Sequence, residues 1–368
     1  MITLVLFLST WDPSRSVLTQ YKTDRGFSVT GAQTNEAPAA YAVNRLAQKN
    51  KKIDRIIALV TPAAKESALE KFKATMTKLS PSTKIIVALI PNDVTATELL
   101  SKTLKNLLPI KPPDSVILDT TGGFRNAVNA LTLLSRFLRY EGVDVEFSTY
   151  SDFTTKRVTD TGETDGLFEL LDAVNIFATT GNARAIKDVF PKWKLAEKIA
   201  FFRATQNFYD SLLICRASRI EVDIKALQAA IDGLAKADYD AGSSRVLVFK
   251  ELVLAIVEQK MTFLSSPTLL LDCIKWCGDN GYLQQAVTFL KESVVKNNSG
   301  RMLDRFEFNV LRYLRNNINH ASKKPIYDEN ATPREIEKVT HLLDNPNDIK
   351  GFVESLLTKI KEKSRMRI

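Results

Sequence analysis

Histidine and cysteine are scarce in this chain, with two histidines and three cysteines among 368 residues. An odd and sparse set of cysteines argues against a disulfide framework and favours a reducing compartment. Cys273 and Cys277 lie one helical turn apart, but neither histidine is close enough in sequence to complete a set of metal ligands. We therefore expect these two cysteines to lie on a buried helix face, and we expect no metal site.

Long apolar runs are also missing. No stretch reaches the roughly 18–20 apolar residues that a membrane helix needs. The apolar opening Ile2–Leu8 has no basic segment before it, and Trp11-Asp12-Pro13 follows where a signal peptide would carry small residues. With 45% hydrophobic and 25% charged residues, the composition is that of a globular protein. We expect a cytoplasmic protein without membrane contact.

Charge is distributed unevenly along the chain. The net charge is +9, of which residues 1–180 (21 basic, 19 acidic) carry +2 and residues 181–368 (30 basic, 23 acidic) carry +7. Part of the excess is a basic tail, made of Lys359, Lys361, Lys363, Arg365 and Arg367. A basic half favours a polyanionic partner there, although a solvated tail without a partner is at least as common.

The first 150 residues alternate short runs rich in Ile and Val with amphipathic stretches. The runs are predicted as buried strands: Leu4–Leu8, Ile56–Thr61, Lys84–Ile90, Val116–Asp119 and Val143–Thr149. The stretches between them are predicted as helices: Ala39–Lys49, Lys65–Leu79, Thr95–Leu107 and Asn126–Tyr140. Such alternation indicates right-handed crossovers and a Rossmann-like α/β fold with a mostly parallel sheet. Thr154–Asp160 is predicted to add an antiparallel edge hairpin.

From about Trp193 onward the chain favours helical periodicity with few β-branched runs, which predicts an all-α domain. The predicted helices are Ala196–Ala217, Ile224–Ala237, Ser244–Glu258, Leu269–Cys277, Leu283–Val295, Arg301–His320, Pro333–Leu343 and Ile349–Lys361. Turn residues at Thr180-Gly181-Asn182 place the boundary in Thr179–Phe190. We therefore expect an α/β domain over residues 1–180 and a helical domain over residues 190–368.

Polar residues follow two of the predicted strands at their carboxyl ends, where open parallel sheets bind ligands. Ser9, Thr10 and Trp11 follow the first strand. The segment Asp119-Thr120-Thr121-Gly122-Gly123-Phe124-Arg125-Asn126 follows the fourth strand and leads into a helix. Hydroxyls, two glycines that let the backbone approach closely, and a helix N-terminus together suit a phosphodiester, and the Arg125 guanidinium would add a positive charge.

The same segment is compatible with an ordinary strand-to-helix turn, in which Thr121 caps the helix and the glycines adopt left-handed conformations. Trp11 suits stacking on a base but is more commonly a packed surface residue. Gly-x-Gly-x-x-Gly after the first strand and a Walker A lysine are both missing, which disfavours a nicotinamide enzyme and a P-loop enzyme.

A second candidate site is Arg315-Asn316-Asn317-Ile318-Asn319-His320. The His320 imidazole can move protons near neutral pH, and the Arg315 guanidinium can stabilise negative charge on phosphorus. Asn316, one helical turn before His320, could orient its ring. RNA carries its own nucleophile, the 2′-hydroxyl, so these groups suffice without a metal. The other histidine, His341, lies among ordinary helical residues and is predicted to be structural or exposed.

The spacing of Arg315 and His320 presents a geometric difficulty. Residues five apart on a regular helix diverge by about 140°, so these two side chains do not share a face. Either the helix is distorted between them, or the site is composite across a two-fold dimer.

The two candidate sites, in this order along the chain, resemble the CARF–HEPN ribonucleases of type III CRISPR systems, of the Csm and Csx type. The resemblance rests on two motifs, Asp119 to Arg125 in the α/β part and Arg-x-x-x-x-His in the helical part. The segment Asn280-Gly281-Tyr282-Leu283-Gln284-Gln285-Ala286-Val287 is similar to these proteins as well. The resemblance covers nearly the whole chain.

The resemblance implies a CARF domain that senses a cyclic oligoadenylate and a HEPN domain that acts as a metal-independent, dimeric endoribonuclease in antiviral defence. It places Arg315, Asn316 and His320 in the catalytic motif. It places Ser9, Thr10, Trp11 and the residues Thr120, Thr121, Gly122, Gly123, Phe124, Arg125 and Asn126 around the activator. The ring size stays open, as does degradation of the activator by the CARF domain.

Two other functions remain open at this point. A CARF-type sensor acting as a DNA-binding transcription regulator would suit the basic second half, but it requires a compact winged helix-turn-helix unit. A structural dimer whose HEPN-like half has lost activity is the other, and the intact Arg315 and His320 argue against it.

Overall fold

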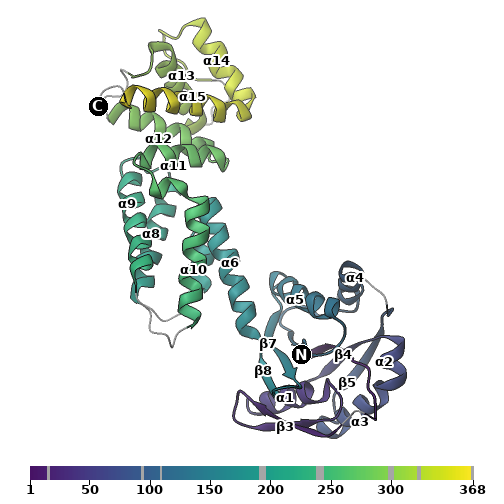
Figure 1. Cartoon of the computed structure of the whole chain (residues 1–368). Coiled ribbons are helices and arrows are strands. Elements are labelled where there is room, and N and C mark those ends of the chain that lie inside the picture. Colours follow the sequence, from purple (N-terminus) through teal and green to yellow (C-terminus); the bar gives the residue numbers. More distant parts are fainter. Residues whose placement is uncertain are drawn as a thin grey trace. The chain divides into compact units, whose positions relative to one another are not determined.

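The N-terminal part of the chain is built on one eight-stranded sheet with helices around it (Figure 1). The computed structural model describes residues 1–14, 17–92, 95–107, 110–189, 196–237, 244–296, 302–320 and 325–365. The chain divides into two compact units, Met1–Leu167 and Phe168–Ile368. The predicted α/β fold with a mostly parallel sheet, followed by an all-helical part, is confirmed.

The strands lie in the order β3-β2-β8-β7-β6-β1-β4-β5. Their bounds are β1 Ile2–Phe7, β2 Thr19–Thr23, β3 Ser28–Gly31, β4 Arg55–Val60, β5 Lys84–Leu89, β6 Ser115–Asp119, β7 Asp144–Asp152 and β8 Arg157–Asp160. Five neighbouring pairs are parallel, and β2–β3 and β7–β8 are antiparallel. Every residue of β1 and of β6 is buried, which is why both strands read as nearly continuous apolar runs.

The prediction of an edge hairpin was right about β8 pairing with β7 but wrong about the edge. β2 continues the sheet in parallel beyond β8, and β3 forms the edge itself. Sequence reading missed β2 and β3 because they are only five and four residues long, and alternate residues of both are exposed. Such short strands give a weak periodic signal.

Helices cover both faces of this sheet. Their bounds are α1 Glu36–Ala47, α2 Pro62–Ser67, α3 Leu69–Leu79, α4 Ala96–Leu107 and α5 Arg125–Tyr140. Leu4 and Leu6 of β1 pack in one core with residues of α1 and α3, whereas Val5 and Phe7 pack in a second core with residues of α5. Alternation of side chains along the strand thus supplies one core on each face. The single helix predicted over Lys65–Leu79 is two, which meet at Ala68.

At the centre of the sheet, between β1 and β6, the chain changes the side on which it adds strands. After β1 the chain forms β2 and β3 at the far edge, beyond β8, and then adds β4 and β5 on one side of β1. It later returns to form β6 and β7 on the other side of β1. β1 and β6 are parallel neighbours in which Leu6 pairs with Asp119, so their carboxyl ends adjoin. Helix α1, which precedes β4, and helix α5, which follows β6, cover opposite faces of the sheet. Adjacent strand ends at such a change of face are where α/β proteins bind ligands.

All secondary-structure elements in the described residues of the second unit are helices. Its elements are α6 Gly162–Thr180 (which begins in the first unit), α7 Arg184–Val189, α8 Ala196–Leu213, α9 Ile220–Lys236, α10 Ser244–Lys260, the 3₁₀ turn Thr262–Ser265, α11 Leu269–Asp279, α12 Leu283–Lys296, α13 Arg305–His320, α14 Pro333–Asp344 and α15 Pro346–Arg365. All eight predicted helices form, with shifted ends. No helix among the described residues is both long and apolar enough to cross a membrane.

The division between the units lies earlier in the chain than the predicted boundary at Thr179–Phe190, of which Phe190 is outside the described residues. The reason is α6, which sequence reading missed. After Phe168 its residues, among them Val174 and Phe177, belong to the core of the helical unit. Apolar residues point from several sides of this helix, so no single apolar stripe marks it in the sequence.

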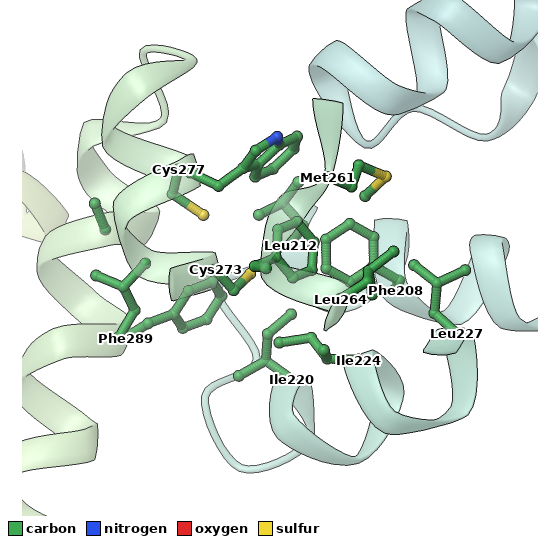
Figure 2. Packing of buried hydrophobic residues seen from close by; sticks show 14 of the residues in the cluster. Phe208, Leu212, Ile220, Ile224, Leu227, Met261, Leu264, Cys273, Cys277 and Phe289 are labelled. Carbon is green, nitrogen blue, oxygen red and sulfur yellow. The ribbon is translucent and has the colours of Figure 1, made fainter. Parts of the chain in front are cut away.

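The core of the helical unit confirms the prediction that Cys273 and Cys277 lie on a buried helix face. Cys273 and Cys277 are fully buried among Phe208, Leu212 and Phe289 (Figure 2). The described residues hold no cluster of three or more His, Cys, Asp or Glu side chains that could bind a metal ion.

The lysines of the basic tail are part of the folded unit. They belong to α15, where Lys359 pairs with Glu307 and Lys361 pairs with Asp272. These ion pairs give two of the tail lysines acidic partners within the chain and leave the net charge of residues 181–368 at +7. The side chain of Arg365 and the whole of Arg367 lie outside the described residues.

Candidate functional site

The carboxyl ends of β1 and β6 are joined directly. The Ser9 hydroxyl after β1 accepts a hydrogen bond from the Gly123 amide after β6, at 2.9 Å. A pocket of about 230 Å³ opens at this junction. It is lined by Phe7, Leu8, Ser9, Thr10, Leu59, Thr61, Ile90, Gly123 and Phe124. The fold therefore brings four predicted ligand residues, Ser9, Thr10, Gly123 and Phe124, into one pocket.

A residue that sequence reading missed, Asn35, holds this junction together. Its fully buried side chain donates to the Phe7 carbonyl (3.1 Å) and to the Asp119 carboxylate (2.8 Å). Its Oδ1 atom accepts from the Ser9 amide at 3.0 Å. One amide thus binds the ends of both strands. Gln33 supports it, because its Nε2 atom donates to the Ser9 carbonyl and to Asn35 Oδ1 at 3.0 and 3.1 Å.

The two glycines meet different constraints at this point. A Cβ atom on Gly122 would lie 2.2 Å from the Phe7 carbonyl oxygen and 2.4 Å from Asn35 Nδ2, so only glycine fits between the strand ends. Gly123 is exposed and has a φ of +89°, a conformation that L side chains rarely adopt. Gly122 therefore allows close packing of the junction, and Gly123 turns the chain toward the pocket.

The N-terminus of α5 has no side-chain cap. Its N-cap residue is Phe124, in an extended conformation, and the Phe124 side chain makes no capping hydrogen bond. The alternative that Thr121 caps this helix is wrong, because the Thr121 hydroxyl accepts from the Ser151 amide of β7 at 2.8 Å. Asn126 is exposed in the first turn. The side chain of Arg125 lies outside the described residues. The Ala127 amide donates to the Phe124 carbonyl at 2.8 Å. The amides before it in the first turn have no side-chain cap and are positioned to bind an anion.

Thr120 and Trp11 are not among the residues that line the pocket. The Thr120 hydroxyl donates to the Thr149 carbonyl of β7 at 2.9 Å. Trp11 packs against the core, its amide donates to Ser67, and the Lys71 ammonium lies 5.6 Å from its ring centroid. The packed state of Trp11 agrees with the commoner of its two sequence interpretations.

Asp119 brings a buried charge to the junction. Its side chain is fully buried, and this burial raises the pKa from 3.8 to about 6 even though Thr121 and Asn35 donate hydrogen bonds that lower it. The Thr121 amide donates to Asp119 at 2.9 Å. A carboxylate under a pocket disfavours an anion, so its protonation state bears on any phosphate bound there.

The second candidate site lies on α13, which is one uninterrupted α-helix from Arg305 to His320. The helix is therefore not distorted between Arg315 and His320, and the two side chains leave it on different faces. His320 is exposed, whereas the Arg315 side chain is 29% exposed and turned toward α12. A composite site is the alternative that this geometry leaves.

The contacts of Arg315 hold its guanidinium against α12. Its Nη2 atom lies 3.6 Å from the Glu292 carboxylate, and its Nη1 atom donates to Asn316 Oδ1 at 3.2 Å. The Nε atom is buried without a hydrogen-bond partner. Asn316 thus contacts Arg315 in this structure. Glu292 was missed by sequence reading because it lies far from the motif in the chain.

A second polar contact joins α12 to α13 beside His320. Asn319 accepts from Gln284 Nε2 at 3.2 Å and donates to the Thr288 hydroxyl at 3.4 Å. Gln284, Thr288 and Glu292 are spaced four residues apart, so they share one face of α12. The segment Asn280–Val287, which carries part of the family resemblance, therefore supplies a residue beside the candidate catalytic helix.

His341 lies on the surface, as predicted. Its Nε2 atom is 2.8 Å from the Asp348 carboxylate, and its side chain is 50% exposed. It belongs to α14, where its ring lies beside Asp348 and Asn345.

Comparison with known proteins leaves the family open. No family model matches the chain, and no curated protein matches its sequence. Among solved structures, the chain is similar to Enterococcus italicus Csm6 bound to cyclic hexa-2′-fluoro-hexa-dAMP. The TM-score is 0.37 and the sequence identity 11%, over 98% of this chain and 99% of that chain. A likeness this distant assigns no activity to the chain.

The raised pKa of Asp119 predicts a pH-dependent stability. Between about pH 4 and pH 6 the folded state holds a proton that the unfolded state has lost, so the free energy of unfolding falls as pH rises through this window and levels off above it. At about 1.4 kcal/mol per pKa unit, the change is about 3 kcal/mol. Asp119→Asn should abolish this contribution, and the measurement is urea unfolding at pH 4, 5, 6 and 7.

Glu66→Gln, which replaces an exposed acid on α2, is the matched control and should keep the wild-type pH profile. A constant difference in unfolding free energy between wild type and Asp119→Asn across the four pH values would contradict the prediction.

Proposed function

We propose that this chain is a metal-independent endoribonuclease that a cyclic oligoadenylate activates, acting on single-stranded RNA in type III CRISPR antiviral defence. The observation that carries the proposal is the Ser9–Gly123 junction. It combines adjoining strand ends, a pocket of about 230 Å³ and an uncapped helix N-terminus at the switch point of an α/β sheet. The resemblance of both motifs to CARF–HEPN ribonucleases gives the ligand and substrate classes.

In the proposed reaction the 2′-hydroxyl of RNA attacks the adjacent phosphorus, the bond from phosphorus to the 5′-oxygen breaks, and a 2′,3′-cyclic phosphate and a 5′-hydroxyl form. The 2′-hydroxyl loses a proton and the 5′-oxygen gains one. His320, exposed on α13, takes up or supplies one of these protons, and water exchanges the other. Arg315 stabilises the negative charge on the phosphoryl oxygens. Asn316 keeps the Arg315 guanidinium in place.

The fold disfavours the alternative of a DNA-binding regulator. A winged helix-turn-helix unit needs a β-hairpin wing, and all strands in the described part of the chain belong to the one sheet of the first unit. We propose a two-fold dimer both for the catalytic motif and for the activator pocket. Arg315 and His320 lie on different faces of α13, and a cyclic ligand with rotational symmetry suits two identical strand ends.

Removal of either catalytic side chain tests the nuclease. Arg315→Ala and His320→Ala should each lower RNA cleavage at least a hundredfold, because each deletes a reacting or charge-stabilising group, and activator binding should persist. Asn316→Ala should be milder. The measurement is cleavage of a fluorogenic single-stranded RNA with cyclic tri-, tetra- and hexa-adenylate, with and without EDTA, and analysis of the product ends.

His341→Ala is the matched control, since it removes the other histidine from an exposed position. Equal loss in both histidine variants, near wild-type turnover in His320→Ala, or sensitivity to EDTA would overturn the assignment.

Mixing the two inactive variants tests the composite site. In a dimer of Arg315→Ala and His320→Ala protomers, one of the two sites still combines an intact arginine with an intact histidine. Random exchange of protomers should therefore restore about a quarter of the wild-type activity. Light scattering should give a homodimer at micromolar concentration. No recovery on mixing, or a fully active monomer, would place both side chains in one protomer's site.

Glycine substitutions test the activator pocket. Gly123→Ala should raise the activator concentration for half-maximal activity at least tenfold, because its Cβ would lie 2.9 Å from Phe7 Cβ at a φ of +89°. Arg125→Ala should shift the curve in the same direction. Gly26→Ala is the matched control, since Gly26 has a φ of +81° and open space around its Cβ position. Superimposable activation curves for wild type and Gly123→Ala would move the activator site elsewhere.

A further inference from the structure

The first turn of α6 contains a buried acid that the proposed function does not use. Asp165 is 7% exposed, and helix α6 continues from it past Leu167, where the first compact unit ends, to Thr180 in the second. A buried carboxylate is costly unless its surroundings supply hydrogen bonds and positive charge. The partners of Asp165 therefore show which elements hold the start of α6.

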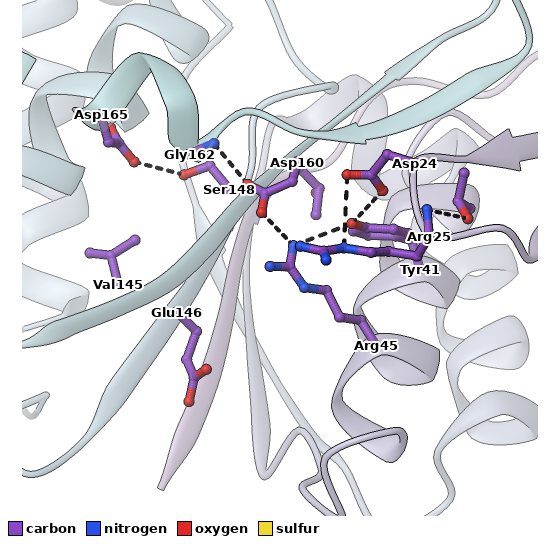
Figure 3. A network of polar contacts seen from close by, with 12 residues as sticks. Asp24, Arg25, Tyr41, Arg45, Val145, Glu146, Ser148, Asp160, Gly162 and Asp165 are labelled. Atoms are coloured by element: carbon purple, nitrogen blue, oxygen red, sulfur yellow. Dashed lines mark hydrogen bonds and ion pairs between the residues drawn. The ribbon is translucent and has the colours of Figure 1, made fainter. Parts of the chain in front are cut away.

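Those partners come from α5 and β7. The Ser135 hydroxyl of α5 donates to Asp165 Oδ1 at 3.0 Å, and Arg139 of the same helix lies 3.7 Å from Oδ2. The Ser148 hydroxyl of β7 donates to Oδ2 at 3.4 Å (Figure 3). Ser135 and Ser148 are themselves buried, so water does not compete freely for these contacts. Asp165 thus joins α6 to α5 through two residues one helical turn apart.

Helix α5 links this cluster to the activator pocket. It begins at Arg125, directly after the Gly122-Gly123-Phe124 segment, and it ends at Tyr140. Its 16 residues span about 24 Å, with the uncapped N-terminus at one end and Ser135 and Arg139 near the other. A helix of this length moves as one rigid body, so a shift of its N-terminus onto an anion also displaces the two residues that hold Asp165.

Asp160, the last residue of β8 and two residues before α6, provides a separate anchor. Asp160 accepts from the Gly162 amide at 2.7 Å and pairs with Arg45 of α1 at 2.6 Å (Figure 3). The Arg45 guanidinium also lies 3.9 Å from the centroid of the Phe147 ring. The start of α6 is therefore fixed to α1 by Asp160, whereas its contact with α5 depends on Asp165. A movement of α5 therefore changes the contact of Asp165 with α5 and leaves the contact of Asp160 with α1 in place.

We propose that Asp165 is the coupling residue through which a movement of α5, caused by activator binding, reaches α6 and the helical unit. The inference rests on the proposed function, since it names how the activator pocket regulates the nuclease. Coupling between two sites requires an element whose position both sites bias, and the α5–Asp165–α6 contact is such an element.

The test separates binding from activation in the full-length chain. Asp165→Asn keeps the size of the side chain and removes the charge. Its affinity for the cyclic oligoadenylate that activates the wild type best should stay within about threefold, and its cleavage without activator should be unchanged. Its cleavage at saturating activator should fall at least tenfold, which corresponds to about 1.4 kcal/mol of coupling. Binding is measured by calorimetry and cleavage with a fluorogenic RNA.

Two further variants keep the result interpretable. Glu163→Gln removes an exposed acid from the same first turn of α6, so it matches the loss of charge at the helix N-terminus and should behave as the wild type. Ser135→Ala removes only a hydroxyl from the α5 side of the contact and should lower maximal activation about threefold. If Asp165→Asn does not fold, the maximal activation of Ser135→Ala alone tests the coupling role.

Wild-type activation in both Asp165→Asn and Ser135→Ala would overturn the coupling role alone. A similar loss in Glu163→Gln would overturn it too, since the effect would then be one of helix charge. A wild type that responds to no cyclic oligoadenylate would overturn the proposed function and the coupling role together.

Discussion

The hydrogen bonds of one buried amide, that of Asn35, are the contact on which the candidate pocket depends. They satisfy the Phe7 carbonyl and the Ser9 amide at the end of β1, and the Asp119 carboxylate at the end of β6. A buried polar group without a partner costs about 1–3 kcal/mol, and native proteins are stable by only about 5–15 kcal/mol. The strand ends therefore cannot separate cheaply, and the pocket is formed before any ligand arrives. Because a preformed pocket has fewer side chains and loops to order when a ligand binds, it loses less binding free energy to that ordering.

The same junction carries a cost. Asp119 is ionised at neutral pH in a fully buried position, although burial raises its pKa to about 6. An asparagine at this position would keep an acceptor for Asn35 or Thr121 and would spare the protein the cost of the buried charge. Destabilising features persist where they serve a function, and this one lies beneath the Gly122–Gly123 turn that leads to the pocket. The charge of Asp119 also makes the local potential depend on pH near the place where an anion would bind.

The sequence predicted the parts of the fold and site that local patterns determine. β1 and β6 were found because continuous apolar runs mark strands that are buried on both faces, and Ser9 and Gly123 were found because they follow those runs. Asn35 was missed because its contacts reach 28 residues back and 84 residues forward along the chain, where no pattern in a short window records them.

Similar reasons explain what was missed in the helical unit. Helix α6 has apolar residues on several sides, which removes the stripe that identifies a surface helix. Glu292 is recognisable only once α12 and α13 are known to be neighbours. The motif on α13 was visible in the sequence, but whether its two side chains meet was not, because that depends on the course of the helix.

The uninterrupted α13 restricts how the two catalytic candidates can work together. Arg315 is turned toward α12, where Glu292 balances its charge, whereas His320 is exposed at the end of the helix. A single phosphodiester has to meet both groups at hydrogen-bond distance. Side chains that diverge by about 140° on one rigid helix do not meet it from one protomer. In the proposed two-fold dimer, the histidine of one chain would instead meet the substrate together with the arginine of the other, and neither helix would have to bend. We infer that the spacing of five residues, which works against a site within one chain, is suited to a site between two.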